Sequence, residues 1–396
     1  MRYFFDIVTW EQRKLKELAI FNPKDNLPEE FEYVDLESVI GTEMLSHKKT
    51  ALSDAPSRAQ RLAKKGDIFY QTVRPYQKND YLFDKDAENY VFSTGYAQIR
   101  PKINGNFLFQ LLRTERFVKK VLNECTGTSY PAINSKDLSN IKVSYTNYKE
   151  EQRSIGSLLD NLDNLVALQQ RKLDQFKQLK TMCLANMFFN SANHVTKLRF
   201  VGFTDNVEKQ SFGNTISHKS GTSIEKYFSP KGQYKVISIG SYGLNGEYID
   251  QGIRAVSNEK TNSHLIRKGE LSMVLNDKTD GKILGRTLLI NKDNEYVVNQ
   301  RSEIIKPNPA LWDTQFAFTY LNGPFRKKVI RIMQGGTQKY INFSSVEKLN
   351  VFLPEVQEQQ KIGFLFKKID AIICHHQQKI LSLKQIRKFL LQNLFI

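Results

Sequence analysis

The chain has 396 residues, of which 40% are hydrophobic and 25% charged, so it is long enough to bury more than one core and lacks the composition of a disordered protein. Its 58 Lys and Arg residues against 41 Asp and Glu residues give a formal net charge of +17 at pH 7. A surplus of that size favours a polyanionic partner, nucleic acid before a membrane surface, over a protein that is merely basic.

The N-terminal segment and the cysteines argue against two further classes of protein. No apolar run approaches the length of about eighteen residues that a membrane-spanning helix needs, and the opening residues MRYFFDIVTWEQRK contain no secretory signal. Cys125, Cys183 and Cys374 are far apart and form no CxxC pair, so neither a disulfide framework nor a zinc site is predicted. We therefore expect a cytoplasmic protein that does not insert into a membrane.

The first part of the chain reads as a mixed α/β (α+β) domain. Short β-branched and aromatic runs predict strands over Asp67–Val73 and Tyr90–Ile99. Apolar residues at helical spacing predict a helix over Phe107–Leu122. A short strand at Ile141–Ser144 then leads into a long helix.

The strand at Asp67 continues into a basic, aromatic loop that ends at Lys78, and a second loop follows Gly127. Arg can pair bidentately with guanine in the major groove, whereas Lys mostly meets phosphate. The alternative is that these are solvated loop charges and that the Gly127 loop only sets up the next strand. The candidate DNA-contacting residues of this half are Thr72, Arg74, Tyr76, Lys78, Thr128 and Ser129.

A long helical segment is repeated. From Glu151 the chain reads EQRSIGSLLDNLDNLVALQQRKLDQFKQLKTMCLANMF, and from Glu358, 207 residues later, it reads EQQKIGFLFKKIDAIICHHQQKILSLKQIRKFLLQNLF without a gap. Solenoid repeats are far shorter than this period. The repeat therefore predicts two copies of one unit, each ending in a long helix, with a pseudo-twofold relation built into one chain.

Shorter landmarks carry the repeat beyond the helices. Lys65-Gly66-Asp67 is echoed by Lys268-Gly269-Glu270, and Gly127-Thr128 by Gly336-Thr337. The second half thus predicts the same order of elements: a strand over Glu295–Ile305, a helix over Trp312–Met333 and a strand over Leu349–Leu353. Its candidate DNA-contacting residues are Asn276, Lys278, Lys282, Arg286, Lys339 and Tyr340.

Both repeated segments carry heptad-spaced apolar residues and predict an antiparallel coiled coil. The seam turns polar midway in both, at Gln169 and Lys172 and at His376 and Lys379, which can fix register between paired helices. The alternative is two independent amphipathic helices, each lying on its own domain. The predicted helix-pairing residues are Ile155, Leu158, Leu162, Leu165, Phe176 and Leu179 in the first helix, and Ile362, Leu365, Ile369, Ile372, Leu383 and Ile386 in the second.

The length of these helices suggests a spacer. A helix of about 38 residues is roughly 57 Å long, enough to hold two domains at least one DNA turn, about 34 Å, apart. Two different readers on such a spacer imply a split, asymmetric target sequence.

Catalytic motifs are missing from the sequence. There is no GxGxxG after a strand and no HExxH, and Gly281-Lys282 lacks the earlier glycine of a Walker A loop. Asn308-Pro309-Ala310 is not the Asn-Pro-Pro-aromatic motif of DNA amino-methyltransferases. We predict no covalent chemistry and no cofactor on this chain. Two alternatives stay open: a nuclease that uses Asp277 or Asp280 with Lys282, and a basic scaffold that binds RNA or protein.

In the order of its motifs the chain resembles the DNA-specificity subunit of a type I restriction–modification system. The resemblance covers essentially the whole length and is carried by WEQRKLKEL at Trp10, KKGDIFYQTVRP, STGYAQIRP, GTSYPAI at Gly127, EEQRSIGSLLDNLD, GGTQKYI and EVQEQQKIGFLFKKID. The second half departs from the family pattern at Val207, where a tryptophan is usual, and in the segment VLNDKTDGKILGR.

The resemblance implies two target-recognition domains, residues 1–147 and 191–354, separated by conserved spacer helices at 148–190 and 355–396. Each domain is expected to read one part of a bipartite site on double-stranded DNA. Two methylation subunits, which bind S-adenosylmethionine and modify adenine, are expected to dock on the helices. ATP-dependent restriction and translocation subunits, with Mg2+, are expected to join them, while this chain is non-catalytic and contributes specificity.

Overall fold

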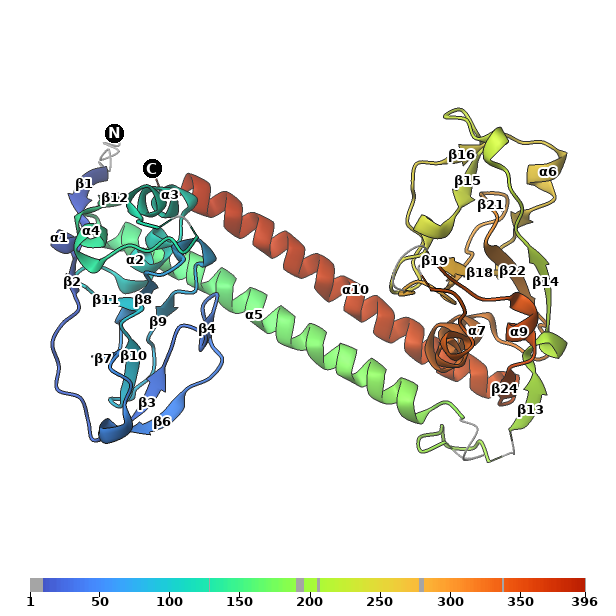
Figure 1. The fold of residues 1–396 in the computed structure, drawn as a ribbon, viewed down its shortest axis with the longest axis horizontal. Coiled ribbons are helices and arrows are strands. Elements are labelled where there is room, and N and C mark those ends of the chain that lie inside the picture. Colours follow the sequence, from blue (N-terminus) through green and yellow to red (C-terminus); the bar gives the residue numbers. More distant parts are fainter. Residues whose placement is uncertain are drawn as a thin grey trace, which may run out of the picture. The chain divides into compact units, whose positions relative to one another are not determined.

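A computed structural model of the chain describes residues 10–127, 129–189, 196–204, 207–277, 281–336 and 338–395 (Figure 1). Its residues form two compact units: Met1–Arg171 with Gln378–Ile396, and Lys172–Gln377. Two 38-residue helices, α5 (Lys149–Asn186) and α10 (Val356–Asn393), contribute residues to both units. Each unit has mixed helix and strand structure and is described by itself.

The first unit contains two four-stranded sheets, in the orders β2-β11-β8-β9 and β6-β3-β10-β7, and a β1-β12 pair. In the second sheet β10 runs parallel to β3 and antiparallel to β7. Its strands are β1 (Trp10–Lys14), β2 (Ala19–Phe21), β3 (Glu30–Val34), β4 (Val39–Ile40), β5 (Glu43–Met44), β6 (Lys48–Ala51), β7 (Ala59–Leu62), β8 (Ile68–Gln71), β9 (Tyr81–Leu82), β10 (Tyr90–Ser93), β11 (Tyr96–Pro101) and β12 (Lys142–Thr146). Its short helices are α1 (Leu15–Leu18), α2 (Gly105–Leu112), α3 (Glu115–Glu124) and α4 (Ser135–Asn140).

The second unit repeats this topology: its four-stranded sheets have the orders β14-β22-β18-β20 and β16-β15-β21-β17, beside a β13-β24 pair. The parallel pair recurs as β21 beside β15. Its strands are β13 (Glu208–Ser211), β14 (Ile216–Ser220), β15 (Tyr234–Ile237), β16 (Arg254–Ala255), β17 (Leu265–Ile266), β18 (Leu271–Val274), β19 (Asn276–Asp277), β20 (Thr287–Leu289), β21 (Tyr296–Val298), β22 (Ser302–Pro307), β23 (Lys339–Tyr340) and β24 (Asn350–Leu353). Its short helices are α6 (Glu259–Asn262), α7 (Thr314–Tyr320), α8 (Arg326–Arg331) and α9 (Phe343–Glu347).

The match of strand orders shows that the duplication covers the domains as well as the helices. One landmark shifts by a residue. Gly127 has φ +86 and its structural counterpart is Gly335, with φ +94, rather than Gly336. The bridges Thr126–Ala132 and Gln334–Tyr340 close these two loops in the same way.

The helices predicted over Phe107–Leu122 and Trp312–Met333 are each broken into two shorter helices in the structure. In the first unit the break lies at Thr114, whose Oγ1 accepts a hydrogen bond from Phe117 N at 3.2 Å and begins α3. In the second unit Gly323 and Pro324 fall between α7 and α8 in a wider helical turn, Leu321–Phe325. Proline has no N–H to donate to the helix ladder, so the regular helix cannot continue there.

Four of the predicted helix-pairing residues are exposed: Leu158, Leu165, Leu179 and Ile386. These four side chains are not buried as a pairing seam requires, because the structure buries the position four residues, not three, after Ile155 and Ile362. Leu159 and Phe366, each four residues after Ile155 and Ile362, have 0% exposure and join the cores of the two units. The other predicted residues are buried or half-buried: Ile155, Leu162, Phe176, Ile362, Leu365, Ile369, Ile372 and Leu383.

Equivalent ion pairs join the helices inside each unit. In the first unit the Asp163 carboxylate accepts hydrogen bonds from the Arg387 guanidinium. In the second unit Lys180 Nζ lies 2.6 Å from Asp370 Oδ1, and Lys180 and Asp370 are related to Arg387 and Asp163 by the offset of 207. There the ring of Phe176 also stacks on His376 with centroids 5.8 Å apart, so the two helix segments of the second unit run antiparallel.

The start of each long helix is fixed to its own domain through an equivalent glutamine side chain that accepts a backbone hydrogen bond. Gln152 Oε1 accepts from Asn104 N at 3.0 Å, and Gln359 Oε1 accepts from Asp313 N at 2.9 Å. Asn104 and Asp313 are the N-caps of α2 and α7. One turn further along the long helix a Cβ atom at Gly156 would lie 2.8 Å from Phe107 N, so glycine is needed there for close approach.

No helix in the described part of the chain is long and apolar enough to cross a membrane.

Candidate nucleic-acid interface

In the first unit the predicted basic loop is a short turn, Pro75–Gln77, tied to the loop after α3. Val73 bridges to Ala132, and Arg74 N donates to Pro131 O at 2.8 Å. Arg74 and Lys78 flank the turn in left-handed backbone conformation, with φ of 54° and 55°. Such conformations are unfavourable for residues with a Cβ and are often found at functional sites.

Half-buried Arg74 and exposed Tyr130 form the centre of this surface. The Arg74 guanidinium lies 4.3 Å from the centroid of the Tyr130 ring, and it forms no ion pair with any described residue. Tyr76, Tyr130 and Ser129 are exposed beside it. An arginine held over an aromatic ring, next to exposed aromatic side chains, is suited to contact bases and phosphates.

Two other predicted residues of this loop support its structure. Thr72 is only 7% exposed and its hydroxyl donates to Gly95 O at 2.8 Å. Lys78 Nζ donates to Glu115 Oε1 at 2.6 Å and to Arg113 O at 3.3 Å. The prediction that Thr72 contacts DNA directly is therefore wrong, since its side chain is occupied inside the domain. Thr128 lies outside the described residues.

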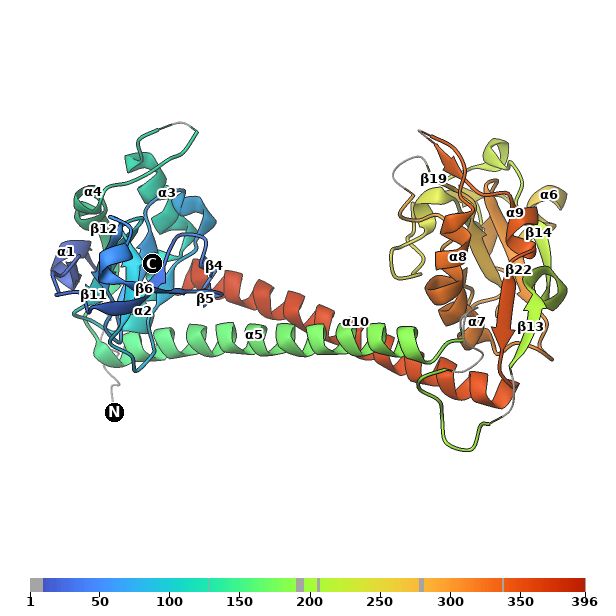
Figure 2. The same ribbon diagram turned by 60° about the horizontal axis from the view of Figure 1, so that its bottom comes forward.

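The second unit builds the equivalent surface from β19 and β23, which pair antiparallel with Asn276 opposite Tyr340 and Asp277 opposite Lys339. Figure 2 shows β19 at the edge of the second unit away from α10. Tyr340 is exposed and Lys339 and Asn276 are half-buried. The fold thus brings these predicted residues together from segments more than sixty positions apart in the sequence. Lys278 lies outside the described residues.

A cluster of basic residues lies next to this pair. Arg286 Nε donates to Lys282 O at 3.3 Å, and Arg326 Nη2 donates to the same carbonyl at 2.7 Å. Burial, followed by the neighbouring Arg286 guanidinium, lowers the pKa of Arg326 to about 10. Neither Arg286 nor Arg326 forms an ion pair with a described carboxylate, so these two guanidinium groups keep their positive charge for a polyanion.

Arg326 is a residue that the sequence did not single out. It begins α8, and its Nε also donates to Leu284 O at 2.9 Å, so it holds the loop that carries Lys282 and Arg286. No local pattern indicates this contact, because the loop and the helix are joined only by the tertiary fold.

Only one of the two acidic residues of the proposed nuclease motif, Asp277, lies in the described part of the chain. Asp277 is buried, with 2% exposure, and its Oδ2 accepts from Ile283 N at 3.2 Å. Asp280 lies outside the described residues. Among the residues that are placed, no group of three or more His, Cys, Asp or Glu side chains is arranged to hold a metal ion. The geometry of Asp277 indicates a structural role for this carboxylate.

Comparison with known proteins matches both halves of the chain to one family. The model of the type I restriction modification DNA specificity domain matches residues 7–178 and again residues 206–385. The chain belongs to this family. The two matches coincide with the repeated order of elements, and each includes most of one long helix.

Individual relatives agree with the family. The chain is 30% identical over 142 residues to the type I restriction enzyme HindI specificity subunit of Haemophilus influenzae, a match that covers 34% of this chain but only 30% of that protein. It is 21% identical over 319 residues to the MjaVIII specificity subunit of Methanocaldococcus jannaschii, covering 79% of this chain and 69% of that protein.

Solved structures resemble the fold. The type I restriction–modification S subunit from M. genitalium has a TM-score of 0.64 at 15% identity and covers 100% of this chain and 98% of that one. A chain from a study of complex assembly and conformational transition of a type I R-M system has a TM-score of 0.53 at 20% identity, with 98% and 97% covered. At such low identity the likeness concerns the fold alone.

Proposed function

We propose that this specificity-domain chain is the DNA-reading, non-catalytic subunit of a type I restriction–modification complex, and that its two units read the two parts of a bipartite, asymmetric site. The observation that carries the proposal is the repeated surface: the same two loops, closed by equivalent bridges, present basic and aromatic side chains in both units. The residues on these loops differ between the units, so the two half-sites differ too.

Within each surface the contacts divide by chemistry. Arg74 is the base-reading candidate of the first unit, because its guanidinium is stacked on Tyr130, forms no ion pair with a described residue and can pair bidentately with guanine. Asn276 and Arg286 are the corresponding candidates of the second unit. Exposed Lys282 is assigned to phosphate, as is Lys278, because an ammonium group is a point charge without a fixed direction.

The long helices are proposed to form an antiparallel coiled-coil spacer that also binds two methylation subunits. The ion pairs inside each unit support helix pairing, and the apolar side chains on the outer faces of α5 and α10 support docking. The exposed ones include Leu158, Leu165, Leu179, Phe364, Ile386 and Phe389. S-adenosylmethionine is expected on the methylation subunits, and ATP and Mg2+ on the restriction subunits that join them.

The proposal is tested by sequencing the methylated DNA of cells that carry this chain with its methylation subunits. We expect modified adenines in one bipartite motif, and a different motif when this chain is exchanged for a related one. A motif that follows the methylation subunits instead of this chain would contradict the proposal. Metal-dependent cutting of DNA by the purified chain, abolished by Lys282→Ala, would favour the nuclease instead.

Replacing Arg74 by alanine should relax recognition of one half-site and leave the other unchanged. The loss of a bidentate contact should cost about 1–3 kcal/mol of discrimination at the base it reads. Methylation of half-site variants measures this directly. Arg153→Ala is the matched control, because Arg153 is an exposed arginine of α5 outside the loops. Equal loss on every half-site variant would make Arg74 a positioning residue.

Inserting four residues after Lys172 should alter the preferred gap between the half-sites. Four residues add one helical turn and about 6 Å to α5, while they keep its apolar face within roughly 40° of its former direction. Methylation of a library of sites with different gaps measures the change. Four residues inserted after Gly202, in the exposed segment beyond α5, are the control and should leave the gap unchanged. An unchanged gap in a folded helix variant would contradict the spacer.

A further inference from the structure

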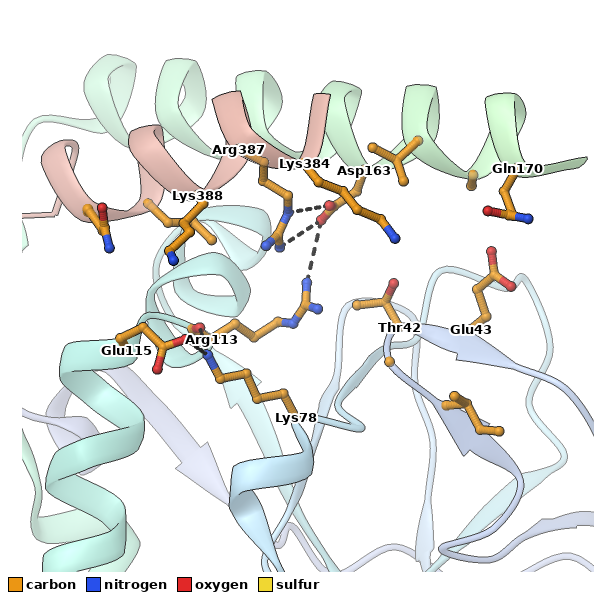
Figure 3. Close-up of a pocket in the computed structure, with 16 residues that line it drawn as sticks. Thr42, Glu43, Lys78, Arg113, Glu115, Asp163, Gln170, Lys384, Arg387 and Lys388 are labelled. Atoms are coloured by element: carbon orange, nitrogen blue, oxygen red, sulfur yellow. Dashed lines mark hydrogen bonds and ion pairs between the residues drawn. The ribbon is translucent and has the colours of Figure 1, made fainter. Parts of the chain in front are cut away.

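The first unit contains a cavity of about 530 Å³ between its domain and its two helix segments. The wall on the domain side is formed by the β4–β5 turn, by Lys78 and by the start of α3. The opposite wall is formed by α5 around Asp163 and by α10 around Arg387 (Figure 3).

Basic side chains dominate the charge of this cavity. The acidic lining residues are Glu43, Glu115 and Asp163. The basic lining residues are Lys78, Arg113, Lys384, Arg387 and Lys388. The formal charge of the lining is therefore positive.

Two of the three carboxylates are already neutralised. Asp163 accepts from Arg387 and lies 3.4 Å from Arg113 Nη1, while Glu115 Oε1 lies 2.6 Å from Lys78 Nζ. Lys384 and Lys388 are exposed and form no ion pair with a described residue. In Figure 3 their amino groups lie on the α10 side of the cavity, across from Lys78. The positive charge that remains is thus directed into the cavity.

The cations are crowded. Burial, followed by the neighbouring Arg387 guanidinium, lowers the pKa of Arg113 below its ordinary value. Arg113 Nε is buried and has no hydrogen-bond partner among the described residues. An anion in the cavity would reduce the repulsion between these groups, since it would screen one guanidinium from the other.

The second unit does not repeat this arrangement. At the offset of 207, Lys388 corresponds to Thr181, and the position of Arg113, nine residues after the N-cap of α2, corresponds to Asn322 in the second unit. Asp370 there is 2.6 Å from Lys180, and among the described residues no arginine pairs with it as Arg113 does with Asp163. Lys384, Arg387 and Asp163 have the counterparts Lys177, Lys180 and Asp370, so the first unit differs from the second by the charges of Arg113 and Lys388.

We propose that this cavity binds phosphate groups of the DNA backbone and so positions the first unit on the duplex without reading sequence. This inference rests on the proposed function. DNA is favoured as the source because Lys78 ends the same turn that begins with Arg74, so the cavity continues directly from the candidate interface. Lysine and arginine are the usual ligands of backbone phosphates, and such contacts fix register and orientation.

The test replaces Lys384 and Lys388 by alanine, singly and together. Lys379→Ala is the matched control, an exposed lysine of the same helix that does not line the cavity. The full chain with its methylation subunits is titrated with cognate and scrambled duplexes at several salt concentrations. Each cavity lysine removed should lower the slope of log affinity against log salt by about 1, with equal losses on both duplexes. Lys379→Ala should leave the slope unchanged.

The possible results separate the proposals. If the wild-type complex does not prefer the cognate duplex, the proposed function is contradicted. The salt dependence of its affinity for scrambled DNA, compared with that of the lysine variants, still tests the cavity. An unchanged slope in the double variant overturns the cavity proposal. If that variant keeps its slope but loses methylation subunits, the lysines bind an acidic protein surface instead. In a further measurement, the wild-type chain and the double variant are heated with pyrophosphate. If pyrophosphate stabilises only the wild-type chain, while the slope of log DNA affinity against log salt is the same for both, a free anion is identified as the ligand and the assignment to DNA is overturned.

Discussion

Replacing Leu159 by alanine should destabilise the first unit by about 2–5 kcal/mol, whereas the same change at Leu158 should alter its stability by no more than about 0.5 kcal/mol. The two leucines are neighbours on α5, but Leu159 is 0% exposed inside the core of the first unit and Leu158 is 45% exposed. Truncation at Leu159 leaves a cavity beside residues such as Phe107, while truncation at Leu158 removes only solvated surface.

Hydrogen exchange of the intact chain is the measurement of choice, because two units need not unfold in a single transition. Protection should fall in α2 and in the first half of α5 for Leu159→Ala and stay unchanged for Leu158→Ala. Equal losses at the two positions would restore the seam predicted from the heptad pattern. Leu158→Ala can also be tested by its affinity for methylation subunits. This affinity should fall if the outer face of α5 is their docking surface.

The register of this seam could not be predicted from the sequence, because α5 and α10 carry two apolar stripes instead of one. Leucine occurs at both 158 and 159, so periodicity alone does not decide which stripe faces the protein. The choice is made by close contacts at the start of each helix. Gln152 accepts a hydrogen bond from the N-cap residue of α2, and Gly156 lets α5 approach the first turn of α2 closely. With α5 held in this orientation, Leu159 points into the core.

The duplicated fold was predictable, because its signal is an ungapped repeat supported by ordered landmarks. The order of sheet strands is the same in both units and extends the repeat into segments where the two sequences differ almost completely. Divided helices were missed at Thr114 and Pro324. In both places the apolar spacing continues across the break, while a cap or a proline ends the backbone ladder.

The candidate site was predictable as loops but not as side chains. The basic, aromatic sequence of the loop does not distinguish Arg74, Lys78 and Thr72 as candidates for DNA contact. Only the tertiary structure shows that Lys78 is paired with Glu115 and that Thr72 is buried. Arg326 was missed for the same reason, since its contacts with the Lys282 loop join residues 42 and 44 positions apart.

A second large effect is expected at a buried ion pair in the second unit. The Arg199 guanidinium donates two hydrogen bonds of 2.8 Å to the Glu358 carboxylate, whose side chain is only 1% exposed. Arg199→Ala should cost about 3–5 kcal/mol, because it leaves the carboxylate buried without a partner. Arg153→Ala is the matched control: its pair with Glu150 has the same 2.8 Å distance, but the side chains are 67% and 63% exposed. It should cost no more than about 0.5 kcal/mol.

The double variant Arg199→Met, Glu358→Leu separates the loss of attraction from the cost of an isolated charge. Apolar side chains of similar volume remove both partners, so most of the stability lost in Arg199→Ala should return. Hydrogen exchange of the intact chain, read at the first turns of α10, measures both variants. A double variant as unstable as Arg199→Ala would mean that the stability comes from the contact of the Arg199 guanidinium with the Phe189 ring, whose centroid is 5.6 Å away, and not from neutralising Glu358.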